Sequence, residues 1–133
     1  MRTALASFAV LAPLLAATAP AAAHHSYAAF DKSKVVTIKG TIYAWEMGNP
    51  HGYLWVIVKD AQGTPHTWGL EAPSPLSLIS RGWSKYSVKV GDQVTVALNP
   101  LRDGRNGGSL LQLRLQDGRV LDTGPLPGGG KER

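Results

Sequence analysis

Apolar and polar residues alternate in several short segments of this sequence, and the alternation is interrupted once by a segment of helical character. A period of two places every second side chain on the same face of a β-strand. Gly40 lies in the middle of the first segment, where a strand that bends sharply needs a glycine. One face of that segment carries Val36, Ile38, Ile42 and Ala44. The pattern therefore predicts a β domain that begins with a long, kinked strand.

Further alternating segments follow, each bounded by turn residues. A second strand is predicted from Tyr53 to Lys59 and a third from His66 to Glu71, with the Asp60–Gly63 turn between them. Val94, Val96 and Leu98 alternate in a fourth strand, and Leu111, Leu113 and Leu115 alternate in a fifth. Asp117-Gly118 is a hairpin signal, so Val120-Leu121 is expected to add a short last strand.

The interruption is a predicted helix from Ser74 to Arg81. Ser74 is a favourable N-cap, and Pro75 suits the first helical position because it has no N–H to leave unpaired. Gly82 follows as the residue that ends the helix with a positive φ. Trp83 is expected to fold back on Leu78, which is the usual apolar contact of such a helix end.

Three strands, a short helix and two or three further strands are the order of an OB-type barrel. We therefore predict an all-β fold with one short helix, an antiparallel barrel of five to six strands; a β-sandwich is the alternative. The expected domain spans residues 35–122, after an N-terminal segment of residues 24–34. The residues predicted to point inward are Val36, Ile38, Ile42, Val56, Val58, Leu70, Val94, Val96, Leu111 and Leu113.

The first 23 residues have the layout of a secretory signal peptide. One basic residue, Arg2, precedes an uncharged run from Ala4 to Ala17, and small residues follow at Ala21 and Ala23. The run is too short to cross a bilayer, which takes roughly 20 apolar residues. We expect cleavage after Ala23 and a periplasmic or secreted protein without a membrane span. Residues 123–133, rich in glycine and proline, are expected to form a disordered tail.

Composition removes several classes of function. The chain has no cysteine, which excludes disulfides, cysteine-based zinc sites and a thiol nucleophile. The formal net charge is +5, but acidic residues separate the basic ones along the chain. Nucleic-acid binding is therefore not favoured, and no protein partner can be named.

Four sequence blocks carry a resemblance to a known family. They are HHSYAAFD, NPHGYLWV, WGLEAPSPLSLISRGW and GDQVTV, and the similarity runs from His24 to about Asp122. Together they resemble an uncharacterised family of small exported proteobacterial proteins, a domain of unknown function. The resemblance implies export and a compact β domain, and it implies no activity.

Cleavage after Ala23 would make His24 the first residue, followed by His25. An N-terminal histidine offers its α-amine and its imidazole to one metal, and nitrogen ligands in a tetragonal arrangement suit Cu(II). His51, in the turn NPHGY, is the expected second imidazole. Cleavage after Ala21 or Ala22 would instead place a histidine, His24 or His25, at position three of the mature chain. Both forms would still bind copper, but an X-X-His terminus would use its own amide nitrogens.

Three further residues are weaker candidates for the metal site. Met47 offers a soft sulfur ligand for Cu(I), and His66 is a third imidazole. Glu71 precedes the predicted helix, where its charge would interact with the helix dipole; the alternative is a metal ligand or a partner of a metal-binding histidine. The histidines could equally be an unstructured polar start and an ordinary turn residue.

Three functions remain open. We favour an exported binding protein, without a certain cofactor, whose ligand is copper or another transition metal. The alternative is an OB-type module that binds an oligosaccharide, peptide or anionic polymer through its tryptophans and Arg102, Arg105, Arg114 and Arg119. A copper-dependent enzyme is the third and least favoured, because no G-x-S-x-G, H-E-x-x-H or paired acidic motif occurs.

Overall fold

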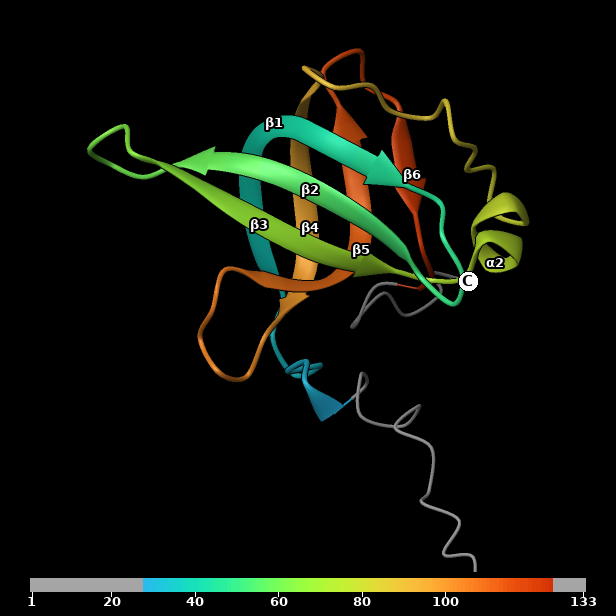
Figure 1. Ribbon diagram of the computed structural model, residues 1–133, viewed down its shortest axis with the longest axis horizontal. Helices are drawn as coiled ribbons and strands as arrows, with labels where there is room; N and C mark the ends of the chain where they lie inside the picture. Colours follow the sequence, from blue (N-terminus) through green and yellow to red (C-terminus); the bar gives the residue numbers. More distant parts are fainter. Residues whose placement is uncertain (1–27, 126–133) are drawn as a thin grey trace, which may run out of the picture.

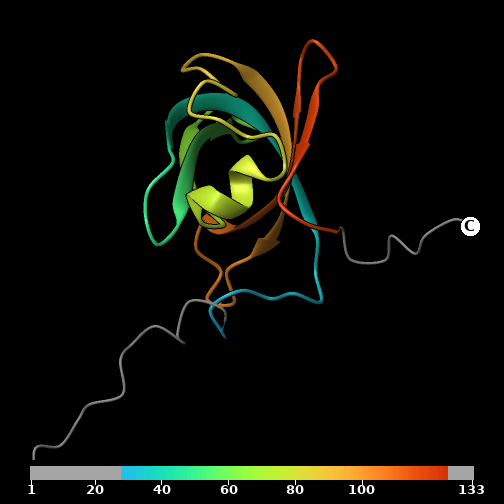
Figure 2. The same cartoon turned by 90° about the vertical axis from the view of Figure 1, so that its right-hand side faces the viewer.

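The computed structural model describes residues 28–125, which form a curved β-sheet closed into a barrel. The predicted signal peptide, His24 and His25 lie outside the described residues. The elements in chain order are β1 (Val36–Glu46), β2 (Gly52–Lys59), β3 (Pro65–Ala72), α2 (Pro75–Ile79), β4 (Gln93–Pro100), β5 (Gly107–Leu115) and β6 (Val120–Asp122). Figure 2 looks into the barrel from the end that α2 covers. The predicted all-β class with one short helix is confirmed.

The barrel closes through a parallel pair of strands. The sheet order is β3-β2-β1-β4-β5-β6, and β3 also pairs with β5 over Gly69–Glu71. All other strand pairs are antiparallel. The predicted barrel is thus correct in kind, but its closing pair is parallel, and β6 extends the sheet beyond the closed ring. Closure removes the free edges that an open sheet of these strands would expose.

The core contains most of the residues predicted to point inward. Ile38, Ile42, Val56, Leu70, Val94, Val96 and Leu113 are buried, and Val36 and Val58 are partly buried against them. The strand alternation therefore predicted the inner face well. The exception is Leu111, which is only partly buried and lies outside the core, whereas Leu110 is buried.

Two irregularities of the sheet change the predicted faces. In the β4–β5 pair, Ala97 faces Gln112, but the next residue, Leu98, faces Leu110. Leu111 therefore has no partner in β4, and Leu110 turns inward in its place. In β1 the register shifts between Ile42 and Ala44, around Tyr43. An extra residue in one strand reverses the faces of the residues beyond it.

The bulge in β1 corrects the prediction that Ala44 belongs to the inner face. Beyond Tyr43 it is Trp45 that faces the buried Leu54 and packs against the core, whereas Ala44 faces the exposed Trp55. The inner face of β1 therefore continues with Trp45.

The helix closes the barrel at one end. Ser74 caps it, with its hydroxyl accepting from the N–H of Ser77, and Pro75 is its first residue, as predicted. Gly82 has φ +84°, and the N–H of Trp83 returns to the carbonyl of Leu78. Leu78 and Trp83 are both buried. The helix ends two residues before the predicted Arg81, and no helix within residues 28–125 is long and apolar enough to cross a membrane.

Candidate functional site

The hairpin of β2 and β3 brings His51 next to Glu71. Gly52 pairs with Ala72 and Tyr53 with Glu71, so the residue before β2 reaches the end of β3. His51 Nδ1 lies 3.1 Å from a carboxylate oxygen of Glu71. The two side chains are 28% and 16% exposed, respectively, so the pair is partly shielded from water. A carboxylate oxygen at this distance favours the imidazole tautomer with its proton on Nδ1, in which the lone pair of Nε2 can bind another group.

The second oxygen of the Glu71 carboxylate accepts a hydrogen bond from the Tyr53 hydroxyl at 3.3 Å. Partial burial raises the pKa of Tyr53, and the negative charge of Glu71 raises it further. Tyr53 therefore remains a protonated donor at neutral pH. Glu71 is held from two sides, by His51 and by its cross-strand neighbour Tyr53.

These contacts bear on the two interpretations of Glu71. The first turn of α2 contains no acidic residue, and Ser74 rather than Glu71 caps the helix. Glu71 lies within ion-pair distance of a histidine, and a carboxylate beside an imidazole is the arrangement that orients imidazoles in metal sites.

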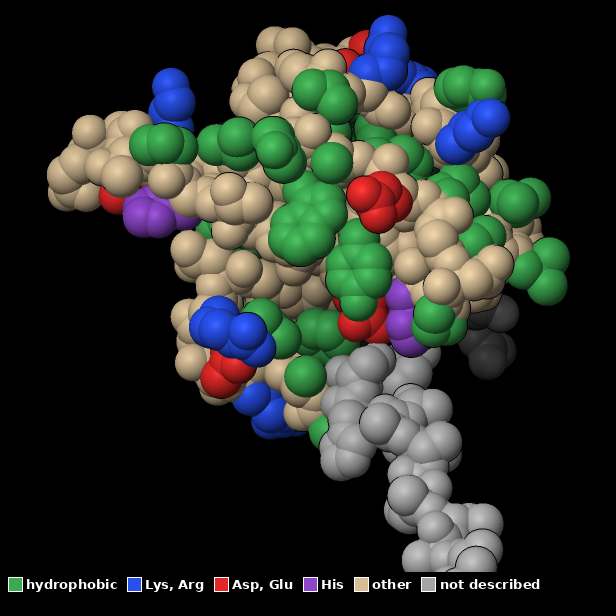
Figure 3. Space-filling model, in the orientation of Figure 1, with side chains coloured by type: hydrophobic (Ala, Val, Ile, Leu, Met, Phe, Trp, Pro, Cys, Tyr) green, Lys and Arg blue, Asp and Glu red, His purple; other side chains and the backbone are tan. Residues whose placement is uncertain are grey.

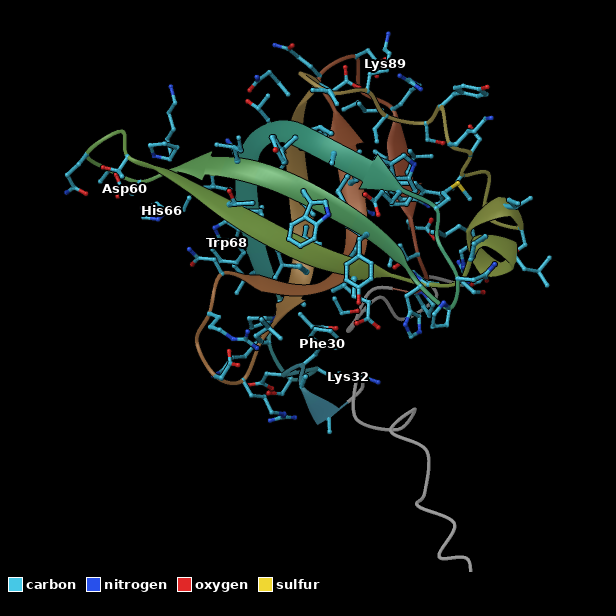
Figure 4. The ribbon with its side chains drawn as sticks, in the orientation of Figure 1. Phe30, Lys32, Asp60, His66, Trp68 and Lys89 are labelled. Carbon is cyan, nitrogen blue, oxygen red and sulfur yellow. The ribbon has the colours of Figure 1, made fainter. Side chains whose placement is uncertain are left out.

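A cleft of about 410 Å³ opens beside this pair. His51 and Glu71 line one part of it, and Phe30 and Lys32 from the N-terminal segment line another. Figure 4 labels Phe30 and Lys32 at the end of the barrel where β4 passes into β5. The chain that leads to the N-terminus therefore borders the same cleft as His51.

The N-terminal segment is fastened to the barrel by backbone pairing. Phe30 forms a bridge with Leu101, and the carbonyl of Ala29 accepts from the N–H of Arg102 at 2.9 Å. The Arg102 guanidinium also donates to the carbonyl of Ala28 at 3.2 Å. Phe30 itself is buried. Sequence patterns gave no indication of this role for Phe30, because a single bridge has no periodicity.

His66 lies at the opposite end of the same hairpin. It faces Val58, near the turn, and its Nε2 is 2.9 Å from a carboxylate oxygen of Asp60. At about 3.3 Å per residue, six residues of β-strand separate it from the end at His51 by about 20 Å. Figure 4 shows His66 and Asp60 at the tip of the projecting hairpin. The structure therefore does not bring His66 to the candidate site.

Met47 also differs from its predicted role. Its side chain is partly buried against the hydrophobic core, and it does not line the cleft at His51. Among residues 28–125, no three histidine, aspartate or glutamate side chains gather as a metal-binding group. His51 and Glu71 form only part of the predicted set, whose other members, His24 and His25, lie outside the described residues.

The tryptophans divide between core and surface. Trp83 is buried, whereas Trp45 and Trp68 are partly buried against the core. Trp55 alone is exposed, on the outer face of β2. The arginines do not form one face: Arg102 and Arg105 precede β5, and Arg119 follows its other end. Arg105 and Arg119 each pair with a local aspartate, so a shared anion-binding surface is not present among these residues.

Comparison with known families gives one match. Residues 10–111 match a family of unknown function, DUF6152. The chain belongs to this family. The match covers the N-terminal segment, β1 to β4 and most of the cleft, so His51 and Glu71 lie within the part of the chain that defines DUF6152. Comparison with curated proteins and with solved structures gave no match.

Proposed function

We propose that this DUF6152 protein is exported and binds one transition-metal ion, with copper favoured, through His24, His25 and His51. The single observation that carries the proposal is the contact between His51 Nδ1 and Glu71. It leaves Nε2 of His51 for a metal while the carboxylate orients the ring. The same contact would strengthen the imidazole as a ligand.

The path of the N-terminal segment supports the proposal. Ala28 is hydrogen-bonded to Arg102, and Phe30 lines the cleft that His51 also lines. At most about 3.6 Å of chain per residue limits His24 to within about 14 Å of Ala28. We propose that a terminal histidine reaches the cleft and shares a metal with His51; His66, the other histidine within residues 28–125, lies at the far end of the hairpin.

The ligand set favours copper among the divalent ions. An α-amine and two imidazoles provide three neutral nitrogens, and such sites bind Cu(II) more tightly than Zn(II). Affinity should fall in acid, because imidazole and amine bind a metal only when unprotonated.

The test is calorimetric titration with Cu(II) of protein that begins at His24, after mass analysis has established the first residue of the exported chain. We compare it with a form whose N-terminal α-amine is acetylated, which removes the amine without creating an X-X-His terminus, and with His51→Ala. Both changes should weaken binding at least tenfold, because each removes one predicted ligand. His66→Ala is the matched control, since His66 also pairs with a carboxylate but at the other end of the hairpin.

Two outcomes would overturn the proposal. Equal copper affinity with and without the acetyl group would show that the α-amine is not a ligand. Undiminished affinity in His51→Ala would show that the terminus binds copper by itself, as an X-X-His sequence does, and that the barrel contributes nothing.

A further inference from the structure

The outer face of the barrel carries two neighbouring aromatic rings that lie nearly parallel. Tyr53 and Trp55 are two residues apart in β2 and so point to the same face. Their ring centroids are 6.2 Å apart and their planes differ by 20°. They are 38% and 36% exposed, respectively, and Figure 3 shows exposed hydrophobic side chains on this face of the barrel. We call this pair the aromatic platform.

Small residues on both sides of Trp55 let the indole lie flat. Its cross-strand partners are Ala44 in β1 and Gly69 in β3. A Cβ atom at Gly69 would come within 2.5 Å of the Trp55 ring. The indole therefore lies directly on the backbone of β3, with its outer face toward solvent. Any side chain at Gly69 would tilt or displace it.

Carboxylates flank the other ring. Tyr53 has Glu46 as its partner in β1 and Glu71 as its partner in β3, and directly opposed residues share a face of the sheet. Figure 3 shows acidic side chains beside exposed hydrophobic ones on this face. The platform thus combines two flat apolar surfaces with hydrogen-bond acceptors and negative charge.

We infer that the platform binds a neutral oligosaccharide. The apolar face of a sugar ring stacks on an aromatic ring, and the sugar hydroxyls donate to carboxylates at its edge. The centroid separation is comparable to the length of one sugar ring along its chain, so Tyr53 and Trp55 can contact consecutive sugars. An anionic polymer is disfavoured, because Glu46 and Glu71 would repel it. This site is separate from the proposed metal site, although Glu71 borders both.

The test is titration of the protein with neutral β-linked hexasaccharides of glucose and of N-acetylglucosamine, followed by calorimetry and by tryptophan fluorescence. We expect binding of one or both. Trp55→Ala and Tyr53→Ala should each weaken it at least about tenfold, by analogy with the loss of a stacked base. Tyr53→Phe keeps the ring and should retain most of the affinity.

Gly69→Ala is the sharpest variant, because it leaves both aromatic residues in place and changes only how Trp55 lies. It should weaken saccharide binding about as much as Trp55→Ala and should shift the tryptophan emission. Tyr86→Ala is the control, since Tyr86 is 77% exposed on the loop after α2 and remote from β2 in sequence. Circular dichroism and thermal unfolding verify that each variant is folded.

The remaining outcomes overturn the inference. Failure of both hexasaccharides to bind would do so, as would binding that survives Trp55→Ala or Gly69→Ala. Tighter binding of oligolysine than of either sugar would make the platform a cation–π site instead. Binding of single-stranded DNA, or self-association abolished by Trp55→Ala, would point to a different occupant. Saccharide binding is measured without added metal, so failure of the metal proposal is read separately.

Discussion

Nδ1 of His51 lies 3.1 Å from a carboxylate oxygen of Glu71. The β2–β3 hairpin positions both residues at its open end, opposite its turn. The distance follows from the strand register. Gly52 pairs with Ala72, so His51, just before Gly52, comes close to Glu71, just before Ala72. The role of Glu71 can therefore be tested without touching any proposed metal ligand.

Glu71→Gln should lower copper affinity about 10- to 100-fold, the usual effect of losing a carboxylate partner of a metal-bound histidine. The amide keeps the size of the side chain but removes its charge. Calorimetry with Cu(II) measures the change. Asp60→Asn, which weakens the equivalent pair with His66, should leave affinity unaltered. Equal losses in the two variants would mean that the effect is not specific to His51.

Leu113→Ala should destabilise the fold by about 2–5 kcal/mol, because Leu113 is fully buried and its removal leaves a cavity. Leu111→Ala should cost clearly less, since the bulge in β5 leaves Leu111 beside the cleft rather than in the core. Urea denaturation of the two variants checks the difference. Equal losses of unfolding free energy in Leu113→Ala and Leu111→Ala would contradict the observed register of β5.

Gly82→Val should destabilise the protein by about 1 kcal/mol or more. A Cβ atom at Gly82 would meet no atom within 4 Å, so the cost comes from the backbone, whose φ of +84° a β-branched residue resists. Gly82→Asn should lose less, because asparagine tolerates this conformation. Thermal unfolding provides the comparison, and a neutral valine variant would be inconsistent with this helix end.

The pKa of Asp60 is lowered, chiefly by its hydrogen bond with His66 and next by the backbone N–H of Thr64. A carboxyl group whose pKa is lower when folded stabilises the protein above its unfolded pKa of about 3.9 and loses that contribution as pH falls further. His66→Ala should therefore raise the pKa of Asp60 and make stability less dependent on pH below about 4. Carboxyl NMR titration measures the pKa, and an unchanged value would show that the His66 contact is not formed in solution.

Sequence pattern was sufficient for much of the fold. The number and order of strands, the Ser74 cap and the positive φ of Gly82 all follow from local preferences. Such features depend on residues within a few positions of one another, so they can be inferred without knowing what packs against them. His51 was also recognisable, as a histidine in a tight turn.

The rest was decided by contacts between distant strands. The bulges at Tyr43 and Leu111 interrupt the β1–β2 and β4–β5 pairs, and they exchange Ala44 for Trp45 and Leu111 for Leu110 on the inner face. Alternation alone cannot locate an extra residue, because both registers satisfy a period of two up to that point.

The candidate site follows the same division. Histidine and glutamate were identifiable from the sequence as chemical groups, and the cross-strand register could have suggested the Tyr53–Glu71 pair from the length of the hairpin. Burial of Phe30 at the cleft, the separation of His66 from His51, and the indole of Trp55 lying on Gly69 needed the tertiary structure. Each is a contact between segments that the sequence keeps apart, and only the closed barrel determines which of them meet.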